Sequence, residues 1–297
     1  MGCKNYLICE EFADSCFPGR AHVAMIGAMA VRENEFQPWW GGRLTPFAKS
    51  LALYGVEMSV FLVFFAVYFL LRGLAIDRPE LATENAMHIV DLERSLGVFW
   101  EPAWQREALQ SQAAVDLGNF VYLNMHFPFL AVLGFFLFHA DRRKHRVIRN
   151  ALIISMFLGI PFYHLIPVTP PRLMAENGFD LGMIDTFAGE RRPRPGPLTN
   201  WYAALPSFHY GWNIVVVVGA WWVWKSPWIR AAAAAFSALM WWAIVITGNH
   251  YFFDMVFGAA LCLGALWLAL KWERWHECNV EHSRKRFFHR DDMRLPC

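Results

Sequence analysis

Apolar residues along this chain fall in long blocks rather than in stripes with a helical or strand period. Several blocks approach or exceed the ~18 consecutive apolar residues that a helix needs to cross a bilayer. We predict six membrane-spanning helices, the fourth and sixth being the shortest, at residues 51–75, 118–140, 147–168, 210–224, 228–247 and 255–270. A soluble all-α protein with buried helices fits blocks of this length poorly. The predicted fold is therefore all-α, a polytopic six-helix membrane bundle.

Composition narrows the class of protein further. Only 18% of the residues are charged, against about 25% in soluble domains. The net charge of +2 gives no case for nucleic acid as a partner. The six cysteines form no C-x-x-C pair and no cluster of metal ligands is visible, so we expect no metal and no cofactor. We divide the chain into an N-terminal region that is partly interfacial or disordered (1–50), a membrane domain (51–272) and a basic cytoplasmic tail (273–297).

Between the first two predicted spans lies an amphipathic stretch, residues 91–109, with the sequence DLERSLGVFWEPAWQREAL. Apolar residues interrupted by charges in this way are typical of a helix that lies on a membrane surface. We considered a catalytic role for Glu93 or Glu101. A solvated helix face is the commoner place for such acids, and we expect both there.

Charge is distributed unequally between the two ends of the predicted spans. The turn at 141–149 carries five Lys or Arg against one acid, and the tail from 271 adds seven more, whereas residues 76–116 carry three arginines against eight acids. The positive-inside rule then places both termini in the cytoplasm. The loop at 169–209 departs from this trend because it holds Arg172, Arg191, Arg192 and Arg194 on the opposite side. We expect that loop to be functional, since long loops in compact domains usually are.

A histidine and an aspartate occur four residues apart where the last predicted span begins. In HYFFD, His250 and Asp254 lie at i and i+4, on one face of a helix. A carboxylate there can accept from one ring nitrogen, which leaves the other nitrogen basic or nucleophilic. Taken alone, the pair is as compatible with a histidine in a surface hydrogen bond at a helix start.

A second histidine, His209, begins the fourth predicted span in the sequence ALPSFHYGW. Ser207 is a predicted N-cap, and a helix N-terminus presents free N–H groups to an anion. His209 near these groups can protonate a leaving oxygen. Alone, this also fits an interfacial histidine, but two such histidines and an arginine-bearing loop on one membrane face indicate a site.

Phosphoryl transfer is the chemistry that this set suits. A histidine backed by an aspartate can attack phosphorus, while arginines and helix N–H groups stabilise charge on the phosphoryl oxygens. A phosphohistidine intermediate lets water or another alcohol complete the reaction. Acyl transfer fits less well, since no serine or cysteine has an evident base beside it, and Ser207 does not face His209 on a helix.

The two motifs resemble those of the type 2 phosphatidic acid phosphatase superfamily, whose second motif is Pro-Ser-Gly-His and whose third ends in His-x-x-x-Asp. Here they read PSFH (206–209) and HYFFD (250–254). The resemblance implies that His250 is the nucleophile, that Asp254 orients it and that His209 is the general acid. It also implies that Ser207 contacts the phosphate.

Two basic positions of that family are missing. Leu165 stands where the first motif has lysine, and Ile244 stands where the third motif has arginine. Arg172, after two prolines, is the best substitute for the phosphate-binding basic set.

These departures resemble one branch of the superfamily, which contains the fungal inositol phosphorylceramide synthases and actinobacterial relatives. The segments that carry this resemblance are YHLIPVTPPRL, WYAALPSFHYGW, TGNHYFFD, DLERSLGVFWEPAWQ and NFVYLNMHFP, and it covers residues 50–272. It implies a six-helix bundle in a bacterial plasma membrane with an extracytoplasmic active site.

Further substrate contacts are predicted at histidines inside the spans. His126 and His164 are ionisable groups in apolar segments, which are functional by default, although packing or helix–helix hydrogen bonding is the alternative. Tyr122 and Asn249 are added as neighbours of these motifs.

The sequence thus favours a membrane phosphotransferase that acts on a lipid phosphate or phosphodiester and passes the group to an alcohol or polyol. A lipid phosphate phosphatase, of the phosphatidic acid or polyprenyl phosphate type, uses the same histidines and is the alternative. A non-catalytic transporter or lipid-binding protein is the third candidate, without the internal repeat that many transporters show. The lipid, the acceptor and the oligomeric state stay open.

Overall fold

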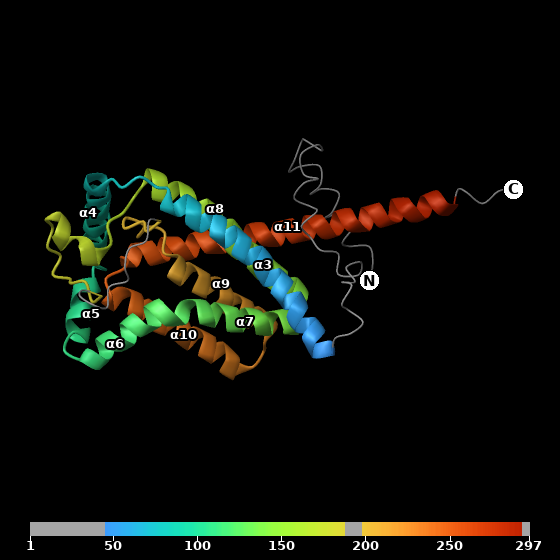
Figure 1. The fold of residues 1–297 in the computed structure, drawn as a ribbon, viewed down its shortest axis with the longest axis horizontal. Coiled ribbons are helices and arrows are strands. Elements are labelled where there is room, and N and C mark those ends of the chain that lie inside the picture. The colour runs from blue at the N-terminus through green and yellow to red at the C-terminus, as the bar shows by residue number, and fades with distance from the viewer. Residues whose placement is uncertain (1–44, 188–197, 293–297) are drawn as a thin grey trace. The chain divides into compact units, whose positions relative to one another are not determined.

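The computed structural model describes residues 45–187 and 198–292, and this part of the chain is all-α (Figure 1). The predicted interfacial segment of the N-terminal region and the arginines at 191, 192 and 194 lie outside these residues. The α-helices are α3 (Pro46–Gly73), α4 (Pro79–Ser95), α5 (Glu101–Ala108), α6 (Gln112–Phe120), α7 (His126–Ala140), α8 (Arg142–Leu165), α9 (Phe208–Val223), α10 (Pro227–Ile246) and α11 (Phe252–Asp292).

Five helical segments are long and apolar enough to cross a membrane. They are Ala48–Gly73, Gln112–Ala140, Arg142–Leu165, Pro227–Ile246 and Phe252–Asn279. These five agree with five of the six predicted spans, and they indicate an integral membrane protein. The segment predicted as the fourth span forms α9, which has only 16 residues. At about 1.5 Å per residue it is about 24 Å long, against a hydrocarbon core of about 30 Å, so the count of six is not confirmed.

Local sequence explains where several helices begin. Asp141 caps α8, because its side chain accepts a hydrogen bond from the backbone N–H of Lys144. Pro79, Pro102 and Pro227 occupy the first helical turns of α4, α5 and α10, where a missing N–H costs nothing. A π-helical turn, η1 (Val121–Met125), joins α6 to α7. The predicted span at 118–140 therefore begins earlier, at Gln112.

Contacts divide the chain into two units, residues 1–53 with 270–297 and residues 54–269. The second unit holds all the predicted site residues. Within it, α9 packs against α7, α8 and α10, and its Trp212 donates a hydrogen bond to Ser155 of α8 over 3.0 Å. Outward-facing positions on the long helices carry exposed large apolar residues, such as Val63, Val132 and Trp267. Exposed apolar faces of this kind suit contact with lipid.

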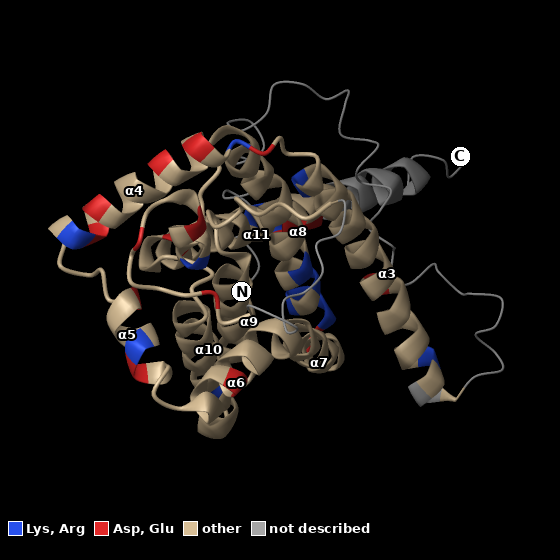
Figure 2. Ribbon diagram, turned by 60° about the vertical axis from the view of Figure 1, so that its left-hand side comes forward, with Lys and Arg blue, Asp and Glu red and all other residues tan. Residues whose placement is uncertain are grey.

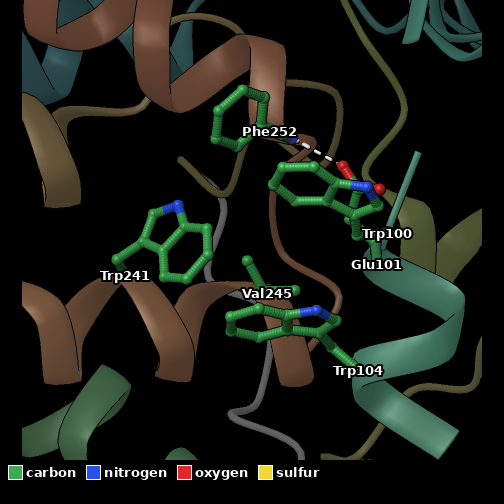
Figure 3. Close-up of a pocket in the computed structure, with 6 residues that line it drawn as sticks. All are labelled: Trp100, Glu101, Trp104, Trp241, Val245 and Phe252. Atoms are coloured by element: carbon green, nitrogen blue, oxygen red, sulfur yellow. Dashed lines mark hydrogen bonds between the residues drawn. The ribbon is translucent and has the colours of Figure 1, made fainter. Parts of the chain in front are cut away.

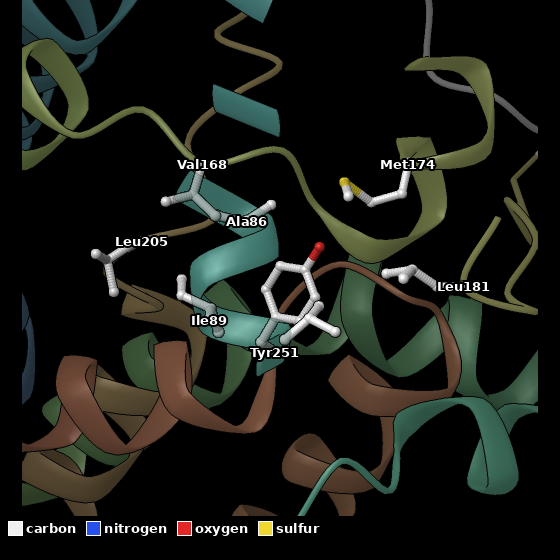
Figure 4. Packing of buried hydrophobic residues seen from close by; sticks show 9 residues of the cluster. Ala86, Ile89, Val168, Met174, Leu181, Leu205 and Tyr251 are labelled. Carbon is white, nitrogen blue, oxygen red and sulfur yellow. The ribbon is translucent and has the colours of Figure 1, made fainter. Parts of the chain in front are cut away.

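Helices α4 and α5 and the loops at 166–187 and 198–207 lie beyond the end of α8 that carries Leu165. Two short 3₁₀ turns, Pro171–Leu173 and Ala175–Asn177, shape the first of these loops. Figure 4 shows their apolar core, in which Ile89 of α4, Met174 and Leu181 surround the ring of Tyr251. Gln105 ties α5 to the same core through its side-chain N–H groups, which donate to the carbonyls of Ile184 and Ile246.

Charged residues follow the pattern that the sequence suggested, with one correction. Figure 2 shows acidic residues along α4 and basic residues on α8. The basic run at 142–149 lies at the start of α8, whereas Asn85 of α4 donates to the carbonyl of Pro167 beyond the end of α8. The expectation that Glu93 and Glu101 face solvent is wrong: each is only 1% exposed. Both accept hydrogen bonds from the start of α11, a partner that local sequence does not reveal.

Candidate functional site

A cavity of about 270 Å³ lies among α3, η1, α7, α8, α9 and the segments that precede α9 and α11. Polar side chains from several separate parts of the chain line it: Tyr68, Arg72, Tyr122, His126, Tyr163, Arg172, Asn200, His209, Asn249 and His250. Most of the remaining lining is aromatic or apolar. A small-ligand site usually has this form, in which polar groups converge in an otherwise largely apolar cavity.

His250 lies in this cavity with its tautomer set by the main chain. Its Nδ1 is 2.6 Å from the carbonyl oxygen of Ala204. A carbonyl can only accept, so Nδ1 carries the proton and Nε2 keeps its lone pair. The Asp254 carboxylate lies 3.7 Å from Nδ1, and its Oδ2 accepts from the backbone N–H of Tyr251 over 3.0 Å. The predicted orienting role is therefore shared: the carbonyl holds the ring, and the buried carboxylate supplies negative charge beside it.

His209 faces the same cavity from the first turn of α9. Its ring centroid is 6.2 Å from that of His250. The ring stacks on Tyr122 at 4.4 Å and contacts His126 at 4.6 Å. Tyr122 lies in the π-helical turn and His126 directly follows it, so this turn brings two of the predicted substrate contacts to His209. Such turns occur frequently at functional sites.

The two histidine motifs are joined by main-chain contact. The backbone N–H of Ser207 donates to the carbonyl of Asp254 over 3.2 Å. Gly258, one turn further along α11, lies so close that a Cβ there would be 2.3 Å from the Ser207 carbonyl oxygen. The start of α9 and the first turns of α11 therefore approach backbone to backbone, which fixes His209 relative to His250.

Ser207 differs from its predicted roles. It directly precedes α9, but its side chain makes no capping hydrogen bond. The hydroxyl oxygen is buried without a hydrogen-bond partner among the described residues, and Ser207 is absent from the cavity lining. Close packing against Gly258 explains the burial. Ser207 is thus the N-cap residue of α9 by position, as predicted, but it does not cap through its side chain. A phosphate contact by Ser207 remains a prediction that this geometry does not favour.

Arg172 is brought into the cavity, as the sequence predicted, together with Asn249. Its Nε donates to the Asn249 side-chain oxygen and its Nη1 to the Asp185 carboxylate, each over 3.0 Å. Its backbone N–H also donates to the carbonyl of Gly248 over 2.9 Å. Gly248 has φ of +64°, a conformation that suits glycine. Arg172 is therefore held firmly, with part of its charge already balanced by Asp185.

His164 is not part of the cavity lining. Its Nε2 lies 2.9 Å from the carbonyl oxygen of Leu71, and the carbonyl oxygen of His164 accepts a hydrogen bond from the Arg78 side chain. His164 links the end of α8 to the end of α3, which fits the alternative of helix–helix hydrogen bonding. A substrate contact by His164 remains a prediction that this geometry does not favour.

Arg72 is a cavity residue that the sequence reasoning missed. It lies in the last turn of α3, inside the first predicted span, with its guanidinium 5.5 Å from the ring centroid of Tyr163. It lines the cavity together with His209 and Tyr122. An arginine inside an apolar block is itself a signal of function, and it could have been used.

Among the described residues, no three His, Cys, Asp or Glu side chains are grouped so as to hold a metal ion. The polar lining consists instead of imidazole rings, guanidinium groups, tyrosine hydroxyls and two amides. It can bind a phosphoryl group through cationic donors while presenting an unprotonated histidine nitrogen.

Comparison with known proteins gives one match. A family model described as the PAP2 superfamily matches residues 87–268, which is more than half of the chain. No curated protein and no solved structure matches. The matched segment includes every predicted site residue, from Tyr122 to Asp254, whereas Arg72 precedes it.

Proposed function

The chain belongs to the PAP2 superfamily, whose members are phosphatases or phosphotransferases acting on phosphate substrates, and from this we propose that it is a membrane phosphotransferase using a phosphohistidine intermediate on a lipid phosphate or phosphodiester. The observation that carries the proposal is the pair His250 and His209, two rings on one cavity with two arginines.

In the first step, the Nε2 lone pair of His250 attacks phosphorus, and the bond from phosphorus to the leaving oxygen breaks. His209 gives its proton to that oxygen. Arg72 and Arg172 balance the charge on the phosphoryl oxygens, which is where such groups lower the barrier most. In the second step, His209 takes the proton of the incoming hydroxyl as its oxygen attacks phosphorus, and His250 leaves unmodified.

A lipid substrate is supported by the apolar side of the cavity. Phe69 of α3 and Phe127 of α7 line it and are 42% and 48% exposed. A cavity wall that continues onto a lipid-facing surface can admit a headgroup while acyl chains stay in the bilayer. A soluble phosphate ester would gain nothing from these side chains.

Transfer, rather than hydrolysis, is favoured by the residue that replaces the family's glycine. The ring of Phe208 stacks on Trp212 and lies edge-on to Tyr68. This aromatic group lines the cavity beside His209 and disfavours water there. The proposal of an inositol-type acceptor rests only on the sequence motifs that resemble the inositol phosphorylceramide synthase branch, since the family match reaches no finer level. A lipid phosphate phosphatase is the second candidate, supported by the same histidines.

We further propose that α9 is a sixth span, which places both termini in the cytoplasm and the cavity at the extracytoplasmic face of a bacterial plasma membrane. The support is the charge distribution, since the basic start of α8 and the acidic α4 lie at opposite ends of α8.

The test uses purified full-length protein in mixed micelles, with His250→Ala beside the wild type. His88→Ala is the matched control, because His88 is exposed on the surface of α4, where it lies 4.0 Å from Glu84. Lipid phosphates and phosphodiesters are offered with and without inositol or ceramide acceptors. Free phosphate and new lipid products are recorded.

A new phospholipid that disappears in His250→Ala supports a transferase and names its acceptor. Free phosphate alone, lost in the same variant, supports the phosphatase. Turnover that survives His250→Ala contradicts the mechanism. The absence of turnover on every lipid favours the non-catalytic alternative.

A further inference from the structure

Two buried carboxyl groups meet the start of α11 from outside the cavity. Glu93 of α4 and Glu101 of α5 are each 1% exposed. Figure 3 shows Glu101 beside Trp100, pointing to the backbone of Phe252. Neither side chain lines the cavity that holds the histidines. The chemistry proposed above uses neither of them, yet burying an unpaired acid is costly, so they need another reason.

Their contacts are to the free N–H groups at the helix start. Glu101 Oε1 accepts from the N–H of Phe252, and Glu93 Oε1 accepts from the N–H of Phe253, each over 2.6 Å. The first N–H groups of a helix have no partner inside it. Together with Asp254, which accepts from the N–H of Tyr251, carboxyl groups bind three successive N–H groups directly after His250.

The two glutamates also act on each other. Each carboxyl group lies close enough to the other to shift its pKa. Their Oε2 atoms are buried with no hydrogen-bond partner in the described residues. A proton between these two oxygens satisfies both, and it leaves the pair with one negative charge rather than two.

We propose that Glu93 and Glu101, sharing one proton, are positioning residues that hold the first turn of α11 and thereby set the place of His250 and Asp254 for phosphoryl transfer. This inference rests on the proposed function for its effect on turnover. The arrangement depends on the shared proton. Without that proton, Glu93 and Glu101 are two carboxylates that repel each other next to Asp254.

The surroundings of the pair make that repulsion strong. Asp254 and Tyr251, both at the start of α11, are the titratable groups that face it. The other neighbours of Glu101 are apolar or aromatic, among them Trp104, Trp241 and Val245. Burial, and after it the charge of Glu101, raises the pKa of Glu93 from 4.5 to about 9, and burial raises the pKa of Glu101 as well. The shared proton is therefore present at neutral pH and leaves only in alkaline solution.

Substitution by glutamine distinguishes two explanations: positioning that depends on a shared proton, and capping of the α11 N-terminus by the acceptor oxygens alone. In Glu93→Gln the side-chain oxygen can still accept from Phe253, while the amide N–H donates permanently to Glu101. We expect Glu93→Gln to keep wild-type kcat near pH 7. Above about pH 9 the wild type should lose kcat with little change in KM, and the variant should keep it for about one further pH unit. Glu93→Ala, which removes the acceptor, should lower kcat about 10–100-fold at every pH, because a small misplacement of reacting groups costs that much.

Asp91→Asn is the matched control, since Asp91 is an exposed acid on the same helix. It should leave the pH profile unchanged. An alkaline loss of kcat at the same pH in the wild type and in Glu93→Gln would overturn the inference. So would Glu93→Ala with unchanged kcat.

Two measurements need no substrate, so they separate this inference from the proposed function. The folded pair holds a proton that the unfolded chain has lost above pH 4.5, so wild-type stability should fall as pH rises from there through about 9. Glu93→Gln should fall less. Amide exchange at Phe252 and Phe253 should be faster in Glu93→Ala than in Asp91→Asn. These measurements can refute the role of the pair even if no lipid is turned over. The refuting results are the same pH dependence of Tm in the wild type and in Glu93→Gln, or equal amide exchange in Glu93→Ala and Asp91→Asn.

Discussion

The close approach of α9 and α11 predicts a large effect from a single methyl group. In Gly258→Ala the new Cβ would lie 2.3 Å from the Ser207 carbonyl oxygen, and real Cβ contacts are essentially never shorter than 3.0 Å. The two backbones must therefore separate by about 0.7 Å, the difference between these distances, and overpacking of this kind costs ~1–3 kcal/mol. The displaced segment carries His209 two residues after Ser207. Because a misplacement of about 1 Å can cost about 10²-fold in rate, we expect kcat to fall about 10–100-fold.

Gly264→Ala on the same helix is the control, because nothing lies within 4 Å of its Cβ position. Alanine is favoured over glycine in a helix by ~1 kcal/mol, so this variant should be at least as stable as the wild type. Turnover of the lipid identified with the wild type and thermal unfolding in the same micelles are measured for both variants. Wild-type kcat and Tm in Gly258→Ala would show that the helices can separate without moving the histidines, and would refute the reasoning.

Two further variants test charges inside the helical unit. Arg72→Gln should raise KM for the phosphate substrate about 10–100-fold, as expected for a charge-assisted hydrogen bond, while the exposed Arg106→Gln leaves KM unchanged; equal KM values in both would remove Arg72 from the site. Glu57→Gln should lower Tm, because Glu57 and Arg149 form an ion pair between α3 and α8 with little exposure, and Glu57→Gln combined with Arg149→Met should recover part of the loss. A double variant no more stable than the single one would contradict that explanation.

The sequence predicts most of what depends on local pattern. Long apolar blocks predict the spans, because a bilayer requires length and apolar composition and little else. The i,i+4 spacing of His250 and Asp254 likewise predicts that they share one helix face. The segment that forms α9 shows the limit of this approach, since hydropathy marks it as apolar and its helical length falls short.

The remainder depends on partners far away in sequence. Glu93 and Glu101 look like solvated acids on an amphipathic stretch, but their acceptor oxygens meet N–H groups 160 and 151 residues further along the chain. Ser207 has the residue type and place of an N-cap, yet its side chain makes no capping hydrogen bond, and its backbone packs closely against Gly258 from a distant part of the sequence. Arg72 was not predicted as a site residue for another reason: the apolar block that contains it was interpreted only as a membrane span.

The nucleophile can be identified by trapping the intermediate. Wild-type protein is mixed with a ³²P-labelled substrate, quenched within one turnover and digested under alkaline conditions, in which phosphohistidine survives. We predict an acid-labile, alkali-stable label on the peptide that contains His250, absent from His250→Ala and present in His88→Ala. Label on any other residue, or unlabelled wild-type protein during active turnover, would contradict transfer through His250.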